Sequence, residues 1–188
     1  MGKLKGLTAA VLVGATILSI AGCSGISVKY LDDEDAFFDA LKSNADIRKK
    51  DMMVHEKDTK FDGVDVEYLT FTEDGPNSYC YIRYEDAEDA MEEFENKYNS
   101  FEDILDDKAF DGDNKMMLTK DQGYLILNGD LDEGTEFDGL TFYMGDTEYY
   151  GGFYVNKNVY IEVYSLNGDR SDKEKIDAIL KELNLPNV

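Results

Sequence analysis

The feature that most restricts the fold is a series of strand-like segments in the second half of the chain, joined by short links. The links carry glycine, asparagine and aspartate, residues that favour tight turns. Tight turns join antiparallel strands, whereas parallel strands need a long crossover connection. The sequence therefore predicts an antiparallel sheet here. The expected strands are Lys115–Lys120, Gly123–Asn128, Asp138–Gly145, Glu148–Asn156 and Asn158–Ser165.

Other segments show apolar residues at helical spacing. The clearest is Asp86–Tyr98, where one apolar stripe is flanked by charged residues. The same period predicts helices at Asp32–Ala45 and Ser171–Asn184, and a short further helix is expected at Ser100–Asp107. These helices are amphipathic, so each is expected to bury one side against the sheet.

The first half also contains a hairpin and a long polar segment. Val64–Tyr68 and Ser78–Tyr84 flank a turn and predict two antiparallel strands. The chain from Asp46 to Gly63 has no clear period and is expected to be a loop with a short strand at 52–54. Together the elements predict one α+β domain over residues 32–188. We expect a mainly antiparallel sheet of about six to seven strands, with three to four amphipathic helices packed on one face.

The N-terminus has the parts of an export signal. Lys3 and Lys5 precede an apolar run of about 14 residues, shorter than the roughly 20 that a spanning helix needs. The run ends in Ile20-Ala21-Gly22-Cys23, which resembles the lipobox of bacterial lipoproteins, with Ile20 where leucine is usual. An ordinary secretory signal with a coincidental cysteine is the alternative.

The lipobox resemblance implies that a diacylglyceryl group is attached to Cys23 and that the bond between Gly22 and Cys23 is cleaved. Residues 1–22 would be the signal peptide and 23–31 the lipidated cysteine with a short tether. Two acyl chains anchor a protein stably where one chain is marginal. The implied location is the cell membrane, at its extracytoplasmic face.

Charge limits the possible partners. Without Lys3 and Lys5 the mature chain has 17 basic and 41 acidic residues, a net charge of −24. Nucleic acid is excluded as a partner, because phosphate binding requires clustered Lys and Arg. An anionic membrane surface should also repel the domain over about 8 Å. The expected partners are the membrane, reached through the lipid on Cys23, and an unknown envelope protein or small ligand.

The chain offers few residues for nucleophilic or zinc chemistry. Once Cys23 carries lipid, Cys80 is the one remaining thiol, so no intramolecular disulfide forms and Cys80 is expected to be a buried, inert core residue. His55 is the one histidine, and one histidine with one free cysteine cannot complete a typical zinc site. A serine triad is disfavoured because there is a single histidine and no Gly-x-Ser-x-Gly motif. No phosphate-binding or dinucleotide-binding glycine motif is present, and we predict no cofactor and no catalytic residue.

Acidic loops raise the question of calcium. Asn128–Gly134 resembles the start of an EF-hand loop, but its glycine is one place late and Gly139 stands where the bidentate glutamate belongs. The segment from Asp106 to Asn114 is also acidic. With so many acids in the chain, solvated loops are the favoured interpretation, and no metal site is predicted.

Tyrosine is the unusual feature of the strands. Several tyrosines alternate with aliphatic residues and would share the sheet face turned away from an aliphatic core. Tyrosine gives a large contact area with a polar tip, which suits recognition. It is also simply a good strand former, which is the plainer explanation. The candidate binding face comprises Tyr79, Tyr81, Tyr143, Tyr150, Tyr154, Tyr160 and Tyr164.

These observations favour a membrane-anchored, non-enzymatic binding or interaction module. Two alternatives remain open. One is a cell-envelope hydrolase that uses paired carboxylates, whose separation no sequence can show. The other is a cation-binding surface protein that uses the acidic loops.

Overall fold

A computed structural model describes residues 27–61, 63–137, 140–141 and 147–187. Gly22, Cys23 and Tyr143 lie outside the described residues. The class of the fold is the predicted one, α+β with an antiparallel sheet.

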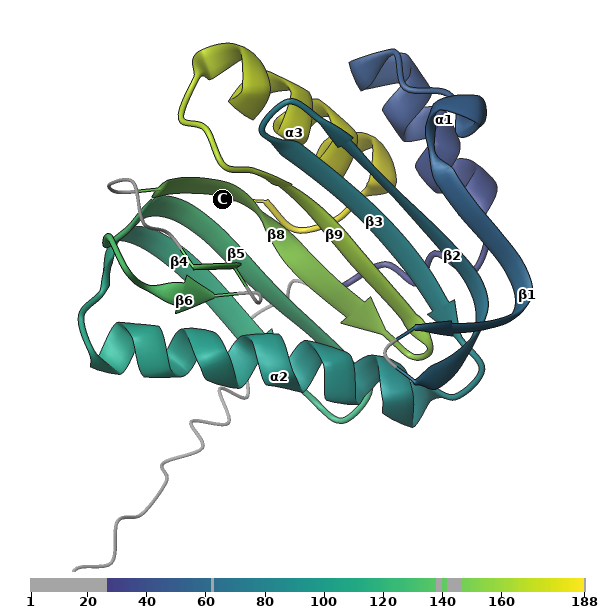
Figure 1. Cartoon of the computed structure of the whole chain (residues 1–188), viewed down its shortest axis with the longest axis horizontal. Coiled ribbons are helices and arrows are strands. Elements are labelled where there is room, and N and C mark those ends of the chain that lie inside the picture. The colour runs from purple at the N-terminus through teal and green to yellow at the C-terminus, as the bar shows by residue number, and fades with distance from the viewer. Residues whose placement is uncertain (1–26, 62, 138–139, 142–146, 188) are drawn as a thin grey trace, which may run out of the picture.

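The main sheet has seven strands among the described residues, in the order β1-β2-β3-β9-β8-β5-β4, and every neighbouring pair is antiparallel (Figure 1). The strand β9 joins β1–β3 to the remaining strands of the sheet, because it pairs with β3 on one side and with β8 on the other. The strands are β1 (Met53–Phe61), β2 (Val64–Asp74), β3 (Asn77–Tyr84), β4 (Phe110–Leu118), β5 (Gln122–Leu131), β8 (Thr147–Asn156) and β9 (Val159–Ser165). A separate two-stranded sheet pairs β6 (Glu136–Phe137) with β7 (Leu140–Thr141).

Helices cover both faces of the main sheet, which corrects the prediction that they share one face. The helices α1 (Glu34–Ala45) and α3 (Arg170–Leu183) contact each other on one face, and α2 (Ala87–Asp106) crosses the other (Figure 1). A short 3-10 helix, η1, occupies Lys49–Asp51. The described residues hold these three α-helices. The short helix expected at 100–107 is the continuation of α2.

Two buried clusters explain this arrangement. One holds Phe37 and Leu41 of α1 with Ile176 and Leu180 of α3, packed on the sheet. The other packs α2 against the opposite side of the same strands. In β9 the residues of both parities are buried. Alternation distinguishes a core face from a solvent face only when one face is exposed, so the parity of these strands could not reveal that both faces are covered.

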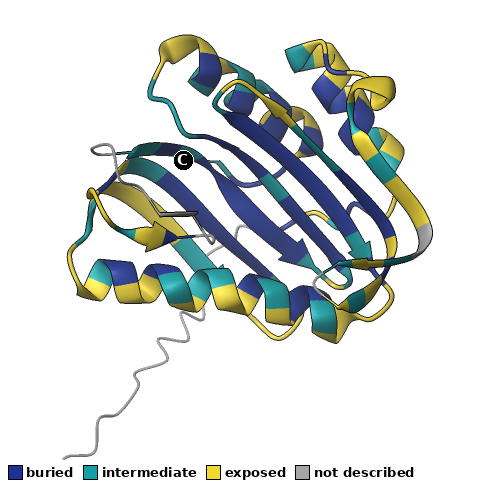
Figure 2. Ribbon diagram, viewed as in Figure 1, coloured by how far each residue is buried: buried dark blue, intermediate teal, exposed yellow. Residues whose placement is uncertain are grey.

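The outer strands depart most from the sequence expectation. The segment expected to be a loop up to Gly63 contains β1, a nine-residue strand at one edge. The acidic segment 106–114 contains the end of α2 and the start of β4, the strand at the other edge. Figure 2 shows the central strands mostly buried and these outer strands largely exposed. An exposed strand needs no apolar pattern, because its backbone pairing holds it in the sheet.

Candidate functional site

Five of the tyrosines proposed as a binding face are buried, and they lie on both sides of the sheet. Tyr79, Tyr81 and Tyr154 belong to the cluster under α1 and α3, whereas Tyr160 and Tyr164 belong to the cluster under α2. Tyr150, the sixth candidate that the structure describes, is half-buried. The five buried tyrosines therefore do not form one exposed face, and Tyr150 is the one candidate among the described residues that is partly exposed. The reason is again that helices cover both faces.

Several of the tyrosine hydroxyls join distant parts of the chain. Tyr154 donates to the carbonyl oxygen of Pro186 at 2.8 Å, and Tyr150 donates to Asp177 of α3 at 2.7 Å. Tyr81 donates to the carbonyl oxygen of Leu31 at 2.9 Å. Burial raises the pKa of Tyr164 to about 12. These side chains thus serve as core residues with polar tips that fix the segments flanking the helices.

The segment leading into α1 is bound tightly to the sheet, and we call residues 28–33 the strap. The Val28 amide donates to the side-chain oxygen of Gln122 at 3.1 Å, and Asn156 donates to the Val28 carbonyl oxygen at 2.6 Å. Tyr30 donates to Asn158 at 3.0 Å. The strap thereby bonds to β5, β8 and the β8–β9 turn at one end of the sheet.

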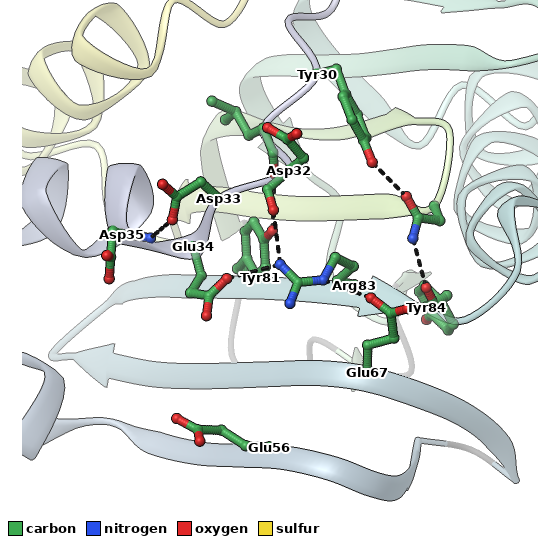
Figure 3. A network of polar contacts seen from close by, with 12 residues as sticks. Tyr30, Asp32, Asp33, Glu34, Asp35, Glu56, Glu67, Tyr81, Arg83 and Tyr84 are labelled. Carbon is green, nitrogen blue, oxygen red and sulfur yellow. Dashed lines mark hydrogen bonds and ion pairs between the residues drawn. The ribbon is translucent and has the colours of Figure 1, made fainter.

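Arg83 of β3 holds the last part of the strap (Figure 3). Its Nη1 atom donates to the carbonyl oxygen of Asp32 and to Glu34 Oε2, each at 2.8 Å. Its Nε atom donates to Glu67 Oε2 on β2 at 2.9 Å. A guanidinium provides several donors in a fixed plane, so one side chain can join the strap, α1 and β2.

Replacing Arg83 with methionine is expected to lower the free energy of unfolding by about 1–3 kcal/mol, because hydrogen bonds to charged groups are lost and the half-buried Glu34 carboxylate loses its partner. Urea denaturation followed by circular dichroism measures this change. Hydrogen exchange at the Val28 amide should also become faster, since the strap is less firmly held.

The matched control is Arg48→Met. Arg48 has an exposed side chain and one ion pair with Asp46 at 3.9 Å, so its replacement should change stability by less than about 0.5 kcal/mol. Equal effects of the two substitutions would contradict the role given to Arg83.

The residues considered for metal and nucleophilic chemistry are not brought together. Cys80 is buried on β3, where burial raises the pKa of its thiol well above the ordinary value, and His55 is exposed on the edge strand β1. The EF-hand-like residues Asn128–Leu131 belong to β5. Among the described residues, no three or more histidine, cysteine, aspartate and glutamate side chains lie close enough to hold a metal ion.

Two carboxylates share one lysine where α2 packs on β9. Lys97 lies 3.8 Å from Glu93 of the same helix and 3.6 Å from Glu162 of β9. Tyr160 donates to Glu162 at 2.7 Å. The lysine between the two carboxylates offsets part of their charge, an arrangement typical of a half-buried structural ion cluster. No sequence signal indicated Glu162 as part of this cluster, whereas the spacing of Glu93 and Lys97 matches a helical ion pair.

In the part of the chain that the structure describes, none of the helices has the length and hydropathy required to cross a bilayer. Comparisons with known proteins add no assignment: no family model matches the chain, and neither the curated proteins nor the solved structures contain a significant match.

Proposed function

We propose that this protein is a lipoprotein anchored through Cys23 at the extracytoplasmic face of a bacterial cell membrane, where its domain acts as a non-enzymatic binding or interaction module. The signal-like segment and the lipobox-like Ile20–Cys23 support the anchor.

The observation that carries the proposal is the position of the strap. Val28 is only 4% exposed, and both its amide and its carbonyl are hydrogen-bonded to the sheet. Cys23 and Val28 are five residue steps apart, which span at most about 18 Å. The folded domain thus begins close behind the lipidated residue, and the tether is shorter than the segment 23–31 expected from the sequence.

Such a short tether orients the domain. The end of the sheet that binds the strap would face the bilayer. This end carries the exposed lysines Lys29, Lys120 and Lys157, and a depression beside the last two is also lined by four acids, Glu88, Glu92, Glu95 and Asp121. Lys157 lies over the ring of Tyr30 at 4.3 Å. Lysines at this end would moderate the repulsion between a domain of net charge −24 and anionic headgroups.

The test is the location of a Cys23→Ala variant in a bacterial host. Without the thiol no diacylglyceryl group can be attached, and more than about nine-tenths of the protein should leave the washed membrane fraction, since the two acyl chains supply the membrane affinity. Quantitative immunoblotting of membrane and soluble fractions measures the change.

Cys80→Ala is the matched control, because it removes the other thiol and leaves the anchor intact. This variant should stay in the membrane fraction. A Cys23→Ala protein that remains with carbonate-washed membranes in a folded state would overturn the proposal.

A further inference from the structure

A small cavity lies where α2 passes the ends of β1, β2 and β3. Its volume is about 170 Å³. The ring of Tyr84 lines it together with the apolar side chains of Phe61 and Val64. On the helix side it is lined by the carboxylates of Asp89, Glu92 and Glu93 and by Asn96. One wall is therefore apolar and the other is negatively charged.

Two polar groups at this cavity lack partners within the described residues. Tyr84 is only 1% exposed, and its hydroxyl makes no hydrogen bond there. The half-buried Asp89 carboxylate has no hydrogen bond or ion pair among the same residues. Buried polar groups in native proteins almost always have partners, so an unpartnered hydroxyl in a cavity that also holds an uncompensated carboxylate points to a ligand.

The charge at the cavity identifies the ligand's sign. Lys97 is shared between Glu93 and Glu162 and leaves the cavity negative. Burial, followed by the charge of Glu93, raises the pKa of the Tyr84 hydroxyl, so the group stays protonated and can both donate and accept hydrogen bonds. The cavity therefore favours a cation that itself donates hydrogen bonds.

A metal ion does not fit this requirement. Calcium takes six to eight oxygen ligands, and the described residues contain no group of three or more acidic, histidine or cysteine side chains able to hold a metal. A bare ion would also make no favourable contact with the apolar side chains of Phe61 and Val64. An organic cation uses both walls.

We propose that this cavity binds a primary alkylammonium group. The ammonium would donate to the Tyr84 oxygen and the Asp89 carboxylate, and its alkyl carbons would lie against Phe61 and Val64. The volume is below the roughly 300 Å³ at which ordinary small-molecule pockets begin, so the cavity suits the end of an alkylamine or a lysyl side chain. The inference gives the proposed binding module a ligand and rests on that role, but it does not depend on the lipid anchor.

The experiment is a titration of the full chain, extracted in mild detergent, with n-butylamine hydrochloride at neutral pH, monitored by isothermal calorimetry against a sodium chloride blank. Saturable binding is expected, with n-butanol at least tenfold weaker because it lacks the charge. Nα-acetyl-lysine methylamide is titrated in parallel. Comparable binding of this blocked lysine points to a lysyl side chain as the source, and binding of n-butylamine alone points to a free amine.

Tyr84→Phe and Asp89→Asn should each weaken n-butylamine binding at least tenfold, while Asp106→Asn, at the far end of α2, should leave it within twofold. Tyr84→Phe removes an unpartnered hydroxyl, so the melting temperature of the free protein should hold or rise, and lost binding cannot then be ascribed to unfolding.

The proposal is overturned if neither amine binds, if both cavity variants bind within twofold of the unmodified chain, or if Ca²⁺ binds there more tightly. Because the anchor is tested by membrane fractionation, these outcomes leave that result unaffected.

Discussion

Replacing Phe153 with alanine is expected to lower the free energy of unfolding by about 3–5 kcal/mol, the usual cost of removing a buried aromatic side chain. Phe153 is fully buried at the centre of the cluster under α2. Its ring centroid lies 5.6 Å from that of Phe137 and 5.3 Å from that of Tyr164. Domains of this kind are stable by about 5–15 kcal/mol, so the loss is a large part of the total.

Urea denaturation gives the measurement. With 13 tyrosines and no tryptophan in the chain, circular dichroism or tyrosine fluorescence is the appropriate signal. Phe153→Leu is the control, because it keeps most of the apolar volume and should cost less than half as much. A loss below about 1 kcal/mol for the alanine variant would show that this cluster does not support the fold.

The second large effect is expected from Gly151→Ala in β8. Gly151 has φ +133°, a conformation that other residues adopt only with strain of about 1–3 kcal/mol. A Cβ atom there would lie 2.2 Å from the Val163 carbonyl oxygen on β9, and moving that backbone costs about 1–3 kcal/mol more. Thermal and urea denaturation should both show the loss.

Gly134→Ala separates the two contributions. Gly134 also has a positive φ, +84°, but a Cβ atom built there meets nothing within 4 Å. This variant should show the strain alone and should therefore lose clearly less stability than Gly151→Ala. Equal losses would mean that the close approach of β8 and β9 contributes nothing.

Elements with a strong internal pattern were predictable from the sequence. The apolar stripe of α2 with its acidic flanks was sufficient to predict that helix, and the turn residues near Asn156 and Asn158 were sufficient for the β8–β9 hairpin. The strand β1 was predicted only as a short strand at 52–54, because an edge strand with polar residues is held by its pairing with β2 and not by burial. Most of the expected strand Asp138–Gly145 lies outside the described residues. Its described part, Leu140–Thr141, is the strand β7.

The candidate sites were much less predictable. The strap depends on Arg83 reaching Asp32 and Glu34, about fifty residues earlier in the chain, and no local pattern indicates such a contact. The Tyr84 cavity forms only where α2 passes the end of β1 and the start of β2, and the helix reaches that position only by docking on the sheet. Asp89 is one of the charged residues that flank the apolar stripe of α2, and it is half-buried because of the way the helix docks on the sheet.

By itself, the sequence determined the class of the fold, most of the helices and the inner strands, because these follow from local periodicity and turn chemistry. It also carries the lipobox resemblance on which the proposed anchor depends. The tertiary structure decided which sheet face each helix covers, where the tyrosines lie and how soon after Cys23 the folded domain begins. The physical reason is that a strand buried on both faces has no polar side from which its orientation can be inferred. Contacts between distant segments, such as those of Arg83 and Tyr84, arise only when the helices dock on the sheet.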